Sequence, residues 1–147
     1  MKYFVLIFLF LINLYAKDTL GQIDRFDLPE FKLTNIQARI DTGATTSSLY
    51  CTNIKEIDSN NISFKILDKY DFIKPILRVS NVKSSNGKVE KRYFIKSEIL
   101  IFDMKYEIEL SLTNREKMKY PLLIGRELLI QNFIVDVSKE NISYEKK

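Results

Sequence analysis

Residues 38–49 read Ala-Arg-Ile-Asp-Thr-Gly-Ala-Thr-Thr-Ser-Ser-Leu, in which an apolar strand pattern leads into a carboxylate and a glycine turn. Thr42 and Gly43 turn the chain directly after Asp41, so the pattern predicts that this carboxylate points out of the sheet. Gly43 allows a tight backbone and the close approach of another chain, and the Thr42 hydroxyl can hydrogen-bond the backbone of the loop. Asp-Thr-Gly alone is a weak signal, because the same residues are common in plain turns.

The second informative stretch is residues 121–129, which read Pro-Leu-Leu-Ile-Gly-Arg-Glu-Leu-Leu. An apolar strand runs into Gly125, and residues 126–132 then have the pattern of a short helix. This stretch gives the Asp-Thr-Gly motif a context that three residues alone cannot supply.

Most of the remaining chain alternates between apolar and polar residues, as half-buried strands do. We predict strands at residues 31–34, 36–40, 62–67, 75–79, 89–95, 99–102, 106–112 and 133–137. Residues 84–87 read Ser-Ser-Asn-Gly, and Asn-Gly is a strong hairpin signal because a type I′ turn needs positive φ at both central positions. Many short strands without long helices predict an all-β sandwich or barrel, and 147 residues fit one domain.

Two absences restrict the chemistry. The sequence contains no histidine, which excludes Ser-His-Asp and Cys-His catalysis and histidine-ligated zinc. Its single cysteine, Cys51, excludes an intrachain disulfide and an all-cysteine zinc site, and we expect this residue to be buried. The available groups are carboxylates, hydroxyls and amines, so we expect no metal and no cofactor. The net charge of +4 is spread over interleaved Lys and Glu, which does not favour a nucleic-acid partner.

Residues 1–16 are typical of a secretory signal peptide, with a basic start, an apolar run of about a dozen residues and Ala16 at the cut. The run is shorter than the ~20 apolar residues of a membrane span. We therefore expect a secreted, periplasmic mature protein that begins near Lys17 and is not stably inserted in a membrane. An uncleaved N-terminal anchor that leaves the domain facing the periplasm stays an alternative.

Three ordered motifs resemble the retropepsin-like aspartic peptidases. More narrowly, they resemble the bacterial group long labelled "ATP-dependent zinc proteases", which is often encoded beside ATP-grasp ligases. The motifs are Ala38 to Ala44, then Ser84 to Gly87 with Glu90, Arg92 and Tyr93, then Met118 to Arg126. The resemblance extends from about Arg39 to Ser138. The zinc label finds no support here, since the usual zinc ligands are missing.

The resemblance implies a single-domain closed β-barrel of the acid-protease (retropepsin-like) fold, with a flap hairpin and one short C-terminal helix. The peptidase domain would span residues 31–140, after a linker or strand at 17–30 and before a polar tail at 141–147. Asp41 would be catalytic, on a loop supported by Thr42, Gly43 and Ala44. The resemblance further implies substrate contacts at Thr45, Ser85, Asn86 and Gly87, and places Ile124, Gly125 and Arg126 beneath the Asp loop.

Two positions depart from these families. Viral retropepsins carry an acidic residue after Asp-Thr-Gly-Ala, which pairs with the arginine of Gly-Arg. Thr45 stands there and cannot form an ion pair, so we expect Arg126 to contact Glu127, Asp136, a carbonyl oxygen or solvent. The narrower bacterial group often has a basic residue at the position of Thr45 and a histidine at that of Tyr50, and their loss could alter specificity.

The chain has one Asp-(Thr/Ser)-Gly, whereas this chemistry needs two carboxylates that share a proton. Chemistry and resemblance together imply a homodimer in which two copies of Asp41 activate a water and hydrolyse a peptide or protein substrate. Residues 133–135 and the region of residues 28–31 could supply the dimer sheet. The resemblance also suggests a functional link to ATP-grasp ligases. Two alternatives stay open: an inactive peptide-binding or assembly module with this fold, and an unrelated exported β-domain.

Overall fold

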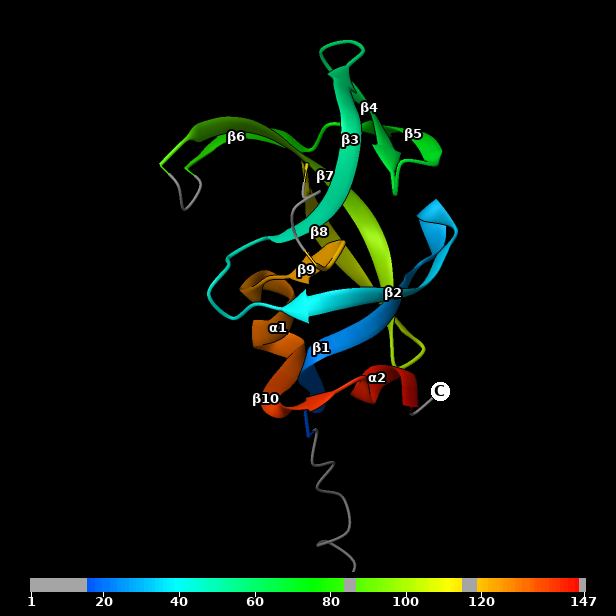
Figure 1. Ribbon diagram of the computed structural model, residues 1–147, viewed down its shortest axis with the longest axis vertical. Coiled ribbons are helices and arrows are strands. Elements are labelled where there is room, and N and C mark those ends of the chain that lie inside the picture. The colour runs from blue at the N-terminus through cyan, green and yellow to red at the C-terminus, as the bar shows by residue number, and fades with distance from the viewer. Residues whose placement is uncertain (1–15, 84–86, 115–118, 146–147) are drawn as a thin grey trace, which may run out of the picture.

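The computed structural model describes residues 16–83, 87–114 and 119–145. Within these ranges the chain forms ten strands and two short α-helices (Figure 1). The strands are β1 (Asp18–Leu28), β2 (Leu33–Ile40), β3 (Ser47–Glu56), β4 (Asn61–Ile66), β5 (Tyr70–Pro75), β6 (Arg78–Lys83), β7 (Val89–Ile101), β8 (Met104–Thr113), β9 (Leu122–Ile124) and β10 (Phe133–Glu140). The helices are α1 (Arg126–Asn132) and α2 (Ile142–Glu145), and a 3₁₀ turn covers Pro29–Phe31. The all-β class predicted from the sequence is confirmed.

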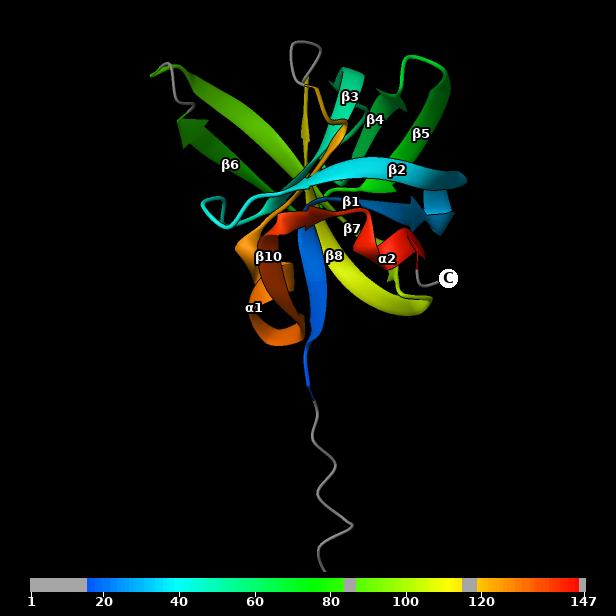
Figure 2. The ribbon, with the colours of Figure 1, turned by 60° about the horizontal axis from the view of Figure 1, so that its bottom comes forward.

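The described strands join in one mixed sheet with the order β10-β1-β2-β9-β3-β8-β7-β6, and β4 and β5 extend from β3. The pairs β1–β10, β2–β9 and β3–β8 are parallel, and the other pairs are antiparallel. The closed barrel stays a prediction, and the sheet has one further pairing, of Asp27 in β1 with Leu100 in β7. Figure 2 shows the β6–β7 and β4–β5 hairpins diverging at one end of the molecule, with α1 and β10 toward the other.

The core lies where alternate residues of several strands face inward. In β4, Ile62, Phe64 and Ile66 are buried and their neighbours are half-buried, the period-2 pattern of a strand. Phe31 and Phe64 pack edge to face, with ring centroids 6.1 Å apart. Each such side chain contributes roughly 1.5–3 kcal/mol on full burial. Cys51 is buried as expected, and this burial raises the pKa of its thiol above the usual value.

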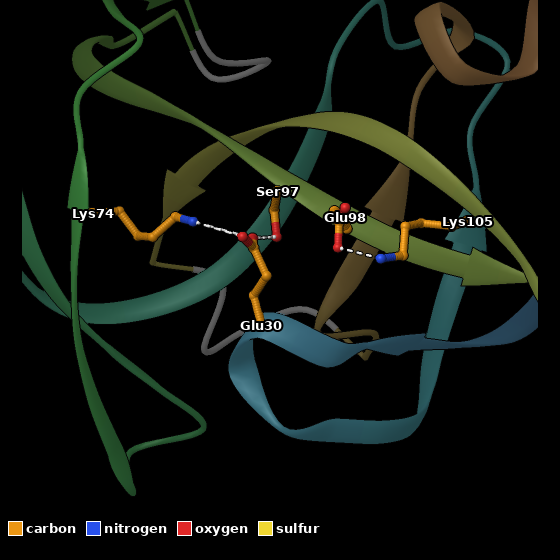
Figure 3. A network of polar contacts seen from close by, with 5 residues as sticks. All are labelled: Glu30, Lys74, Ser97, Glu98 and Lys105. Carbon is orange, nitrogen blue, oxygen red and sulfur yellow. Dashed lines mark hydrogen bonds and ion pairs between the residues drawn. The ribbon is translucent and has the colours of Figure 1, made fainter.

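A polar network ties the 3₁₀ turn to two strands (Figure 3). Glu30 accepts hydrogen bonds from Lys74 of β5 at 3.1 Å and from Ser97 of β7 at 2.6 Å. Partial burial opposes ionisation of Glu30, but the hydrogen bonds from Ser97 and Lys74 and the Lys74 charge outweigh it and lower the pKa of Glu30. Beside it, Glu98 and Lys105 form an ion pair of 3.1 Å. Glu30 therefore stabilises the packing of the turn against the sheet as a charged group.

Several predicted boundaries were wrong. Residues 75–79 are not one strand, because Ile76 and Leu77 leave β5 and donate backbone hydrogen bonds to Asn60 and Phe94. The predicted strands at 89–95 and 99–102 merge into a single strand, β7, which ends at Ile101. β3 was not predicted, and a second helix, α2, follows the single helix that we expected near the C-terminus. The predicted bounds of α1 agree with the structure.

Other expectations concern regions that the structure covers only in part. The predicted signal peptide, residues 1–16, lies outside the described residues except for Ala16. Among the described residues, no helix is long and apolar enough to cross a bilayer. At the β6–β7 hairpin, Ser85 and Asn86 lie outside the described residues, and Gly87 has a φ of +84°. Residues 18–28, within the segment expected as a linker or strand, form β1, and Ile142–Glu145 of the expected polar tail form α2.

Candidate active site

Asp41 stands where β2 ends, beside the short strand β9. Ile40 pairs with Ile124 in a parallel ladder, and the Asp41 amide then donates to the Ile124 carbonyl at 2.9 Å. This last ladder bond fixes where the strand stops and the loop begins. The Asp41 side chain is half-buried, so it is held by the fold and still accessible.

The Asp41 carboxylate is oriented by its own loop. Its Oδ1 accepts hydrogen bonds from the amides of Gly43 at 3.0 Å and Ala44 at 3.2 Å. The other oxygen, Oδ2, accepts none from the described residues. A Cβ at residue 43 would lie 3.2 Å from Oδ1, a tight contact that would disturb the carboxylate. One oxygen is therefore anchored by the backbone, and the other remains available to a ligand.

The segment that contains Gly125 lies directly against the Asp loop. The amides of Arg126 and Glu127 donate to the carbonyls of Ala44 and Thr45 at 2.9 and 3.1 Å. Gly125 itself donates to the Ser47 hydroxyl at 3.0 Å. The structure thus brings together the residues that the sequence selected from two distant stretches.

The side chain of Arg126 has a partner that we did not predict. Its Nη2 donates to the Thr45 hydroxyl at 3.2 Å, and not to Glu127, Asp136 or a carbonyl oxygen. Thr45 therefore still contacts the arginine of Gly-Arg, with a neutral hydrogen bond in place of an ion pair. Both residues are exposed, so water competes for this contact.

Two hollows flank the Asp loop. One, of about 460 Å³, contains Asp41 and Thr42 and is also lined by Arg39, Tyr120 and Val137. The other, which we call the hairpin cavity, measures about 310 Å³ and lies between the Asp loop at Ala44 to Thr46 and Val82, Arg92 and Phe94 of the β6–β7 hairpin.

Of the predicted substrate contacts, Thr45 lines one of these hollows. Thr45 lines the hairpin cavity, whereas Ser85 and Asn86 lie outside the described residues and Gly87 is exposed at the hairpin. Arg92 and Phe94 were not among the predicted site residues. Their alternation in β7 indicates that they share one face, but only the fold shows that this face turns toward the Asp loop. Among the described residues, no cluster of three or more acidic or cysteine side chains could hold a metal ion.

The strand that ends in Asp-Thr-Gly, held from below by an apolar-Gly-Arg segment, defines the retropepsin-like class of folds. The chain belongs to the RimB-like family, described as "Retropepsin-like aspartic endopeptidase RimB", whose family model matches residues 19–146. This membership confirms the resemblance drawn from the three sequence motifs.

Curated relatives carry another name. The chain is 37% identical over 133 residues to a probable alpha-L-glutamate ligase of Shewanella halifaxensis (strain HAW-EB4), covering 84% of this chain and 29% of the relative. It is 35% identical over 130 residues to a protein of the same name from Parasynechococcus marenigrum (strain WH8102), covering 82% and 28%. The chain therefore spans less than a third of the length of these relatives.

A solved structure shares the fold. The crystal structure of a Legionella pneumophila protein of unknown function matches with a TM-score of 0.74 at 28% identity, over 87% of this chain and 99% of that protein. Similarity over nearly the whole of that protein shows that this fold also occurs as a chain of similar size.

Proposed function

We propose that the chain is an exported aspartic endopeptidase that hydrolyses peptide bonds as a homodimer. Each subunit contributes one Asp41, and neither subunit has a complete site alone. The observation that carries the proposal is the Asp41 carboxylate, which has one oxygen fixed by the amides of Gly43 and Ala44. Family membership supports the reaction class.

The mechanism follows from the chemistry of two adjacent carboxylates. Two Asp side chains within hydrogen-bond distance share one proton, because repulsion between two negative charges disfavours ionisation of both. The ionised Asp41 accepts a proton from a water, whose oxygen attacks the carbonyl carbon of the peptide. The protonated Asp41 donates its proton to the carbonyl oxygen. The Asp41 that took the proton from water then gives it to the amide nitrogen of the tetrahedral diol. As the C–N bond breaks, one diol hydroxyl loses its proton to a carboxylate, and the two carboxyl groups again hold one proton between them.

The edge strand β10 is the favoured dimer surface. β10 ends the order of the sheet and pairs with β1 alone among the described strands. Ile134 and Val137 are 56% and 72% exposed, and Val137 lines the same hollow as Asp41. Leu28 and Phe31 are at most 1% exposed because they fill the core, so β10 is favoured over their region, which stays the other predicted dimer surface.

The substrate class is proposed from the relatives. Proteins named probable alpha-L-glutamate ligase contain a region similar to this chain within a much longer polypeptide. A peptidase region joined to a ligase would act on peptides of the kind that the ligase makes. We therefore propose that this chain cleaves peptides that contain α-linked glutamate, in functional connection with such ligases.

Peptide cleavage with and without Asp41 tests the proposal. The purified mature protein is incubated between pH 3 and 8 with glutamate-containing peptides, and products are identified by mass spectrometry. The proposal predicts cleavage with an acid-leaning bell-shaped pH profile, lost in Asp41→Asn while the fold and the dimer are retained. Full activity of Asp41→Asn would contradict it. Peptide binding without cleavage at any pH would instead favour an inactive peptide-binding module.

A further inference from the structure

The hairpin cavity contains an arginine with unused hydrogen-bonding capacity. The Arg92 side chain is 22% exposed, and within the described residues its Nε is buried without a hydrogen-bond partner. A buried polar group without a partner is unfavourable, and a guanidinium always carries its charge. The free protein thus keeps a donor beside the Asp loop that a bound acceptor would satisfy.

The nearest carboxylate does not satisfy Arg92. Oε2 of Glu90 lies 3.6 Å from Nη2 of Arg92, and the Glu90 side chain is 50% exposed. This distance exceeds that of an ordinary hydrogen bond, and the contact involves Nη2 and not Nε. Glu90 therefore balances part of the charge and leaves the Nε–H of Arg92 unpaired.

Arg78, the other arginine of the β6–β7 hairpin, differs from Arg92 because its guanidinium has partners. Arg78 donates from Nε to Glu109 at 2.8 Å, and its guanidinium stacks on the Phe94 ring with 3.5 Å to the centroid. Its donor and its planar face are both in use. This contrast distinguishes Arg92 from an ordinary surface arginine on a β-hairpin.

Strand register directs Arg92 toward the Asp loop. Arg92 pairs with Ser80, and Glu90 with Val82, so Val82, Arg92 and Phe94 share one face of the hairpin and line the cavity. Lys91 projects from the opposite face and pairs with Glu56 at 3.3 Å. A positive charge is therefore present on each face of β7, and that of Arg92 is the one in the cavity.

The lining of the cavity favours an anion. Arg92 is the one ionisable side chain among the described lining residues. The hydroxyl-bearing side chains that line the cavity with it are Thr45, Thr46, Ser48 and Ser111. A volume of about 310 Å³ is at the small end of ligand pockets, which suits one side chain of a longer ligand. A planar guanidinium matches a carboxylate in shape and charge.

We propose that Arg92 is a specificity-determining residue that binds a carboxylate side chain of the peptide substrate in the hairpin cavity. This inference rests on the proposed peptidase function, because the cavity is formed by the loop that carries Asp41. The acidic side chain enters between Thr45 and the hairpin, and Arg92 satisfies its Nε–H with the substrate. The residue thus favours glutamate over glutamine at one position of the peptide.

Binding without cleavage tests this role. The full mature chain carrying Asp41→Asn is titrated against fluorescein-labelled octapeptides of alternating Glu and Ala or alternating Gln and Ala. Fluorescence anisotropy is measured at physiological salt, where exposed charges are largely screened. We expect the Glu peptide to bind about tenfold more tightly or better, the size of one charged hydrogen bond.

The variant Arg92→Gln in the same background should bind both peptides alike. Lys91→Gln is the matched control, because it removes one positive charge from the same strand outside the cavity, and it should keep the preference. Equal binding of the two peptides by Asp41→Asn would overturn the proposal, as would an equal loss of preference in Lys91→Gln. If Arg92→Gln does not fold, Arg92→Lys is tested in its place. An unreduced preference for the Glu peptide in Arg92→Lys would overturn the role of the planar guanidinium.

Different results would contradict the peptidase function and the role of Arg92. Selective binding that depends on Arg92, together with no cleavage by the wild-type protein, would contradict the peptidase and support the cavity. Cleavage of the Glu and Gln peptides at equal rates would support the peptidase and overturn the role of Arg92.

Discussion

Gly125 packs so closely on Thr46 that a Cβ at residue 125 would lie 2.6 Å from the Thr46 carbonyl carbon. The neighbours are backbone atoms of the Asp loop, including the Thr45 carbonyl oxygen at 2.7 Å. Backbone cannot move aside as a flexible side chain can. The position of Asp41 is therefore coupled to the absence of a side chain at a residue far away in the sequence.

Gly125→Ala should displace the Asp loop from β9. Overpacking of this kind costs about 1–3 kcal/mol, and we expect a loss of that size in the free energy of unfolding, measured by urea denaturation. Peptide cleavage should fall more than stability does, since the loop carries Asp41. Gly87→Ala is the comparison, because its Cβ would meet nothing within 4 Å and only its positive φ would cost about 1 kcal/mol. Equal effects of the two variants would argue against the packing account.

Thr45→Asp should convert the neutral contact with Arg126 into an ion pair. Because Arg126 and Thr45 are exposed, the gain in stability should be at most about 1 kcal/mol, and it should vanish at 1 M salt. Thermal unfolding at low and high salt measures it. Thr45→Asn keeps the size without the charge and should show no such salt dependence. A gain that persists at 1 M salt would contradict an electrostatic origin.

Glu30 should make stability depend on pH. Its pKa in the folded protein is lowered, so its contribution is present above the unfolded value of about 4.3 and is lost as the pH falls through the folded pKa. Wild type should therefore be more stable than Glu30→Gln at pH 7, and the difference should shrink at pH 3. Urea denaturation at both values checks this. Glu98→Gln is the control; it breaks the more exposed ion pair with Lys105 and should have a smaller effect on stability. If the stability difference between wild type and Glu30→Gln does not change with pH, the stabilising role of charged Glu30 is refuted.

Local pattern predicts part of this fold and cannot predict the rest. α1 was predicted with its observed bounds because Gly125 precedes a short run of apolar residues at helical spacing. β4 and β8 were predicted from alternation. β3 was not, because Ser47–Glu56 mixes polar and apolar residues, and it becomes a strand through pairing with β4, β8 and β9.

The candidate site divides in the same way. Asp41 and Gly125 belong to short motifs whose meaning is local, so the sequence could select both. The contact of Arg126 with Thr45 and the position of Arg92 in the hairpin cavity depend on which surfaces meet in three dimensions. Sequence periodicity indicates that Arg92 and Phe94 share a face, and the fold alone determines what that face meets.

The central claim is that one active site needs Asp41 from two copies of the chain, and mixed dimers test it most directly. Wild type is exchanged with increasing amounts of Asp41→Asn, and the cleavage rate is measured per wild-type chain. Random pairing of two subunits predicts that this rate falls to about a half in an equal mixture and to about a tenth at ninefold excess of the variant. A rate per wild-type chain that stays constant would contradict the shared site, because each chain would then carry a complete active site of its own.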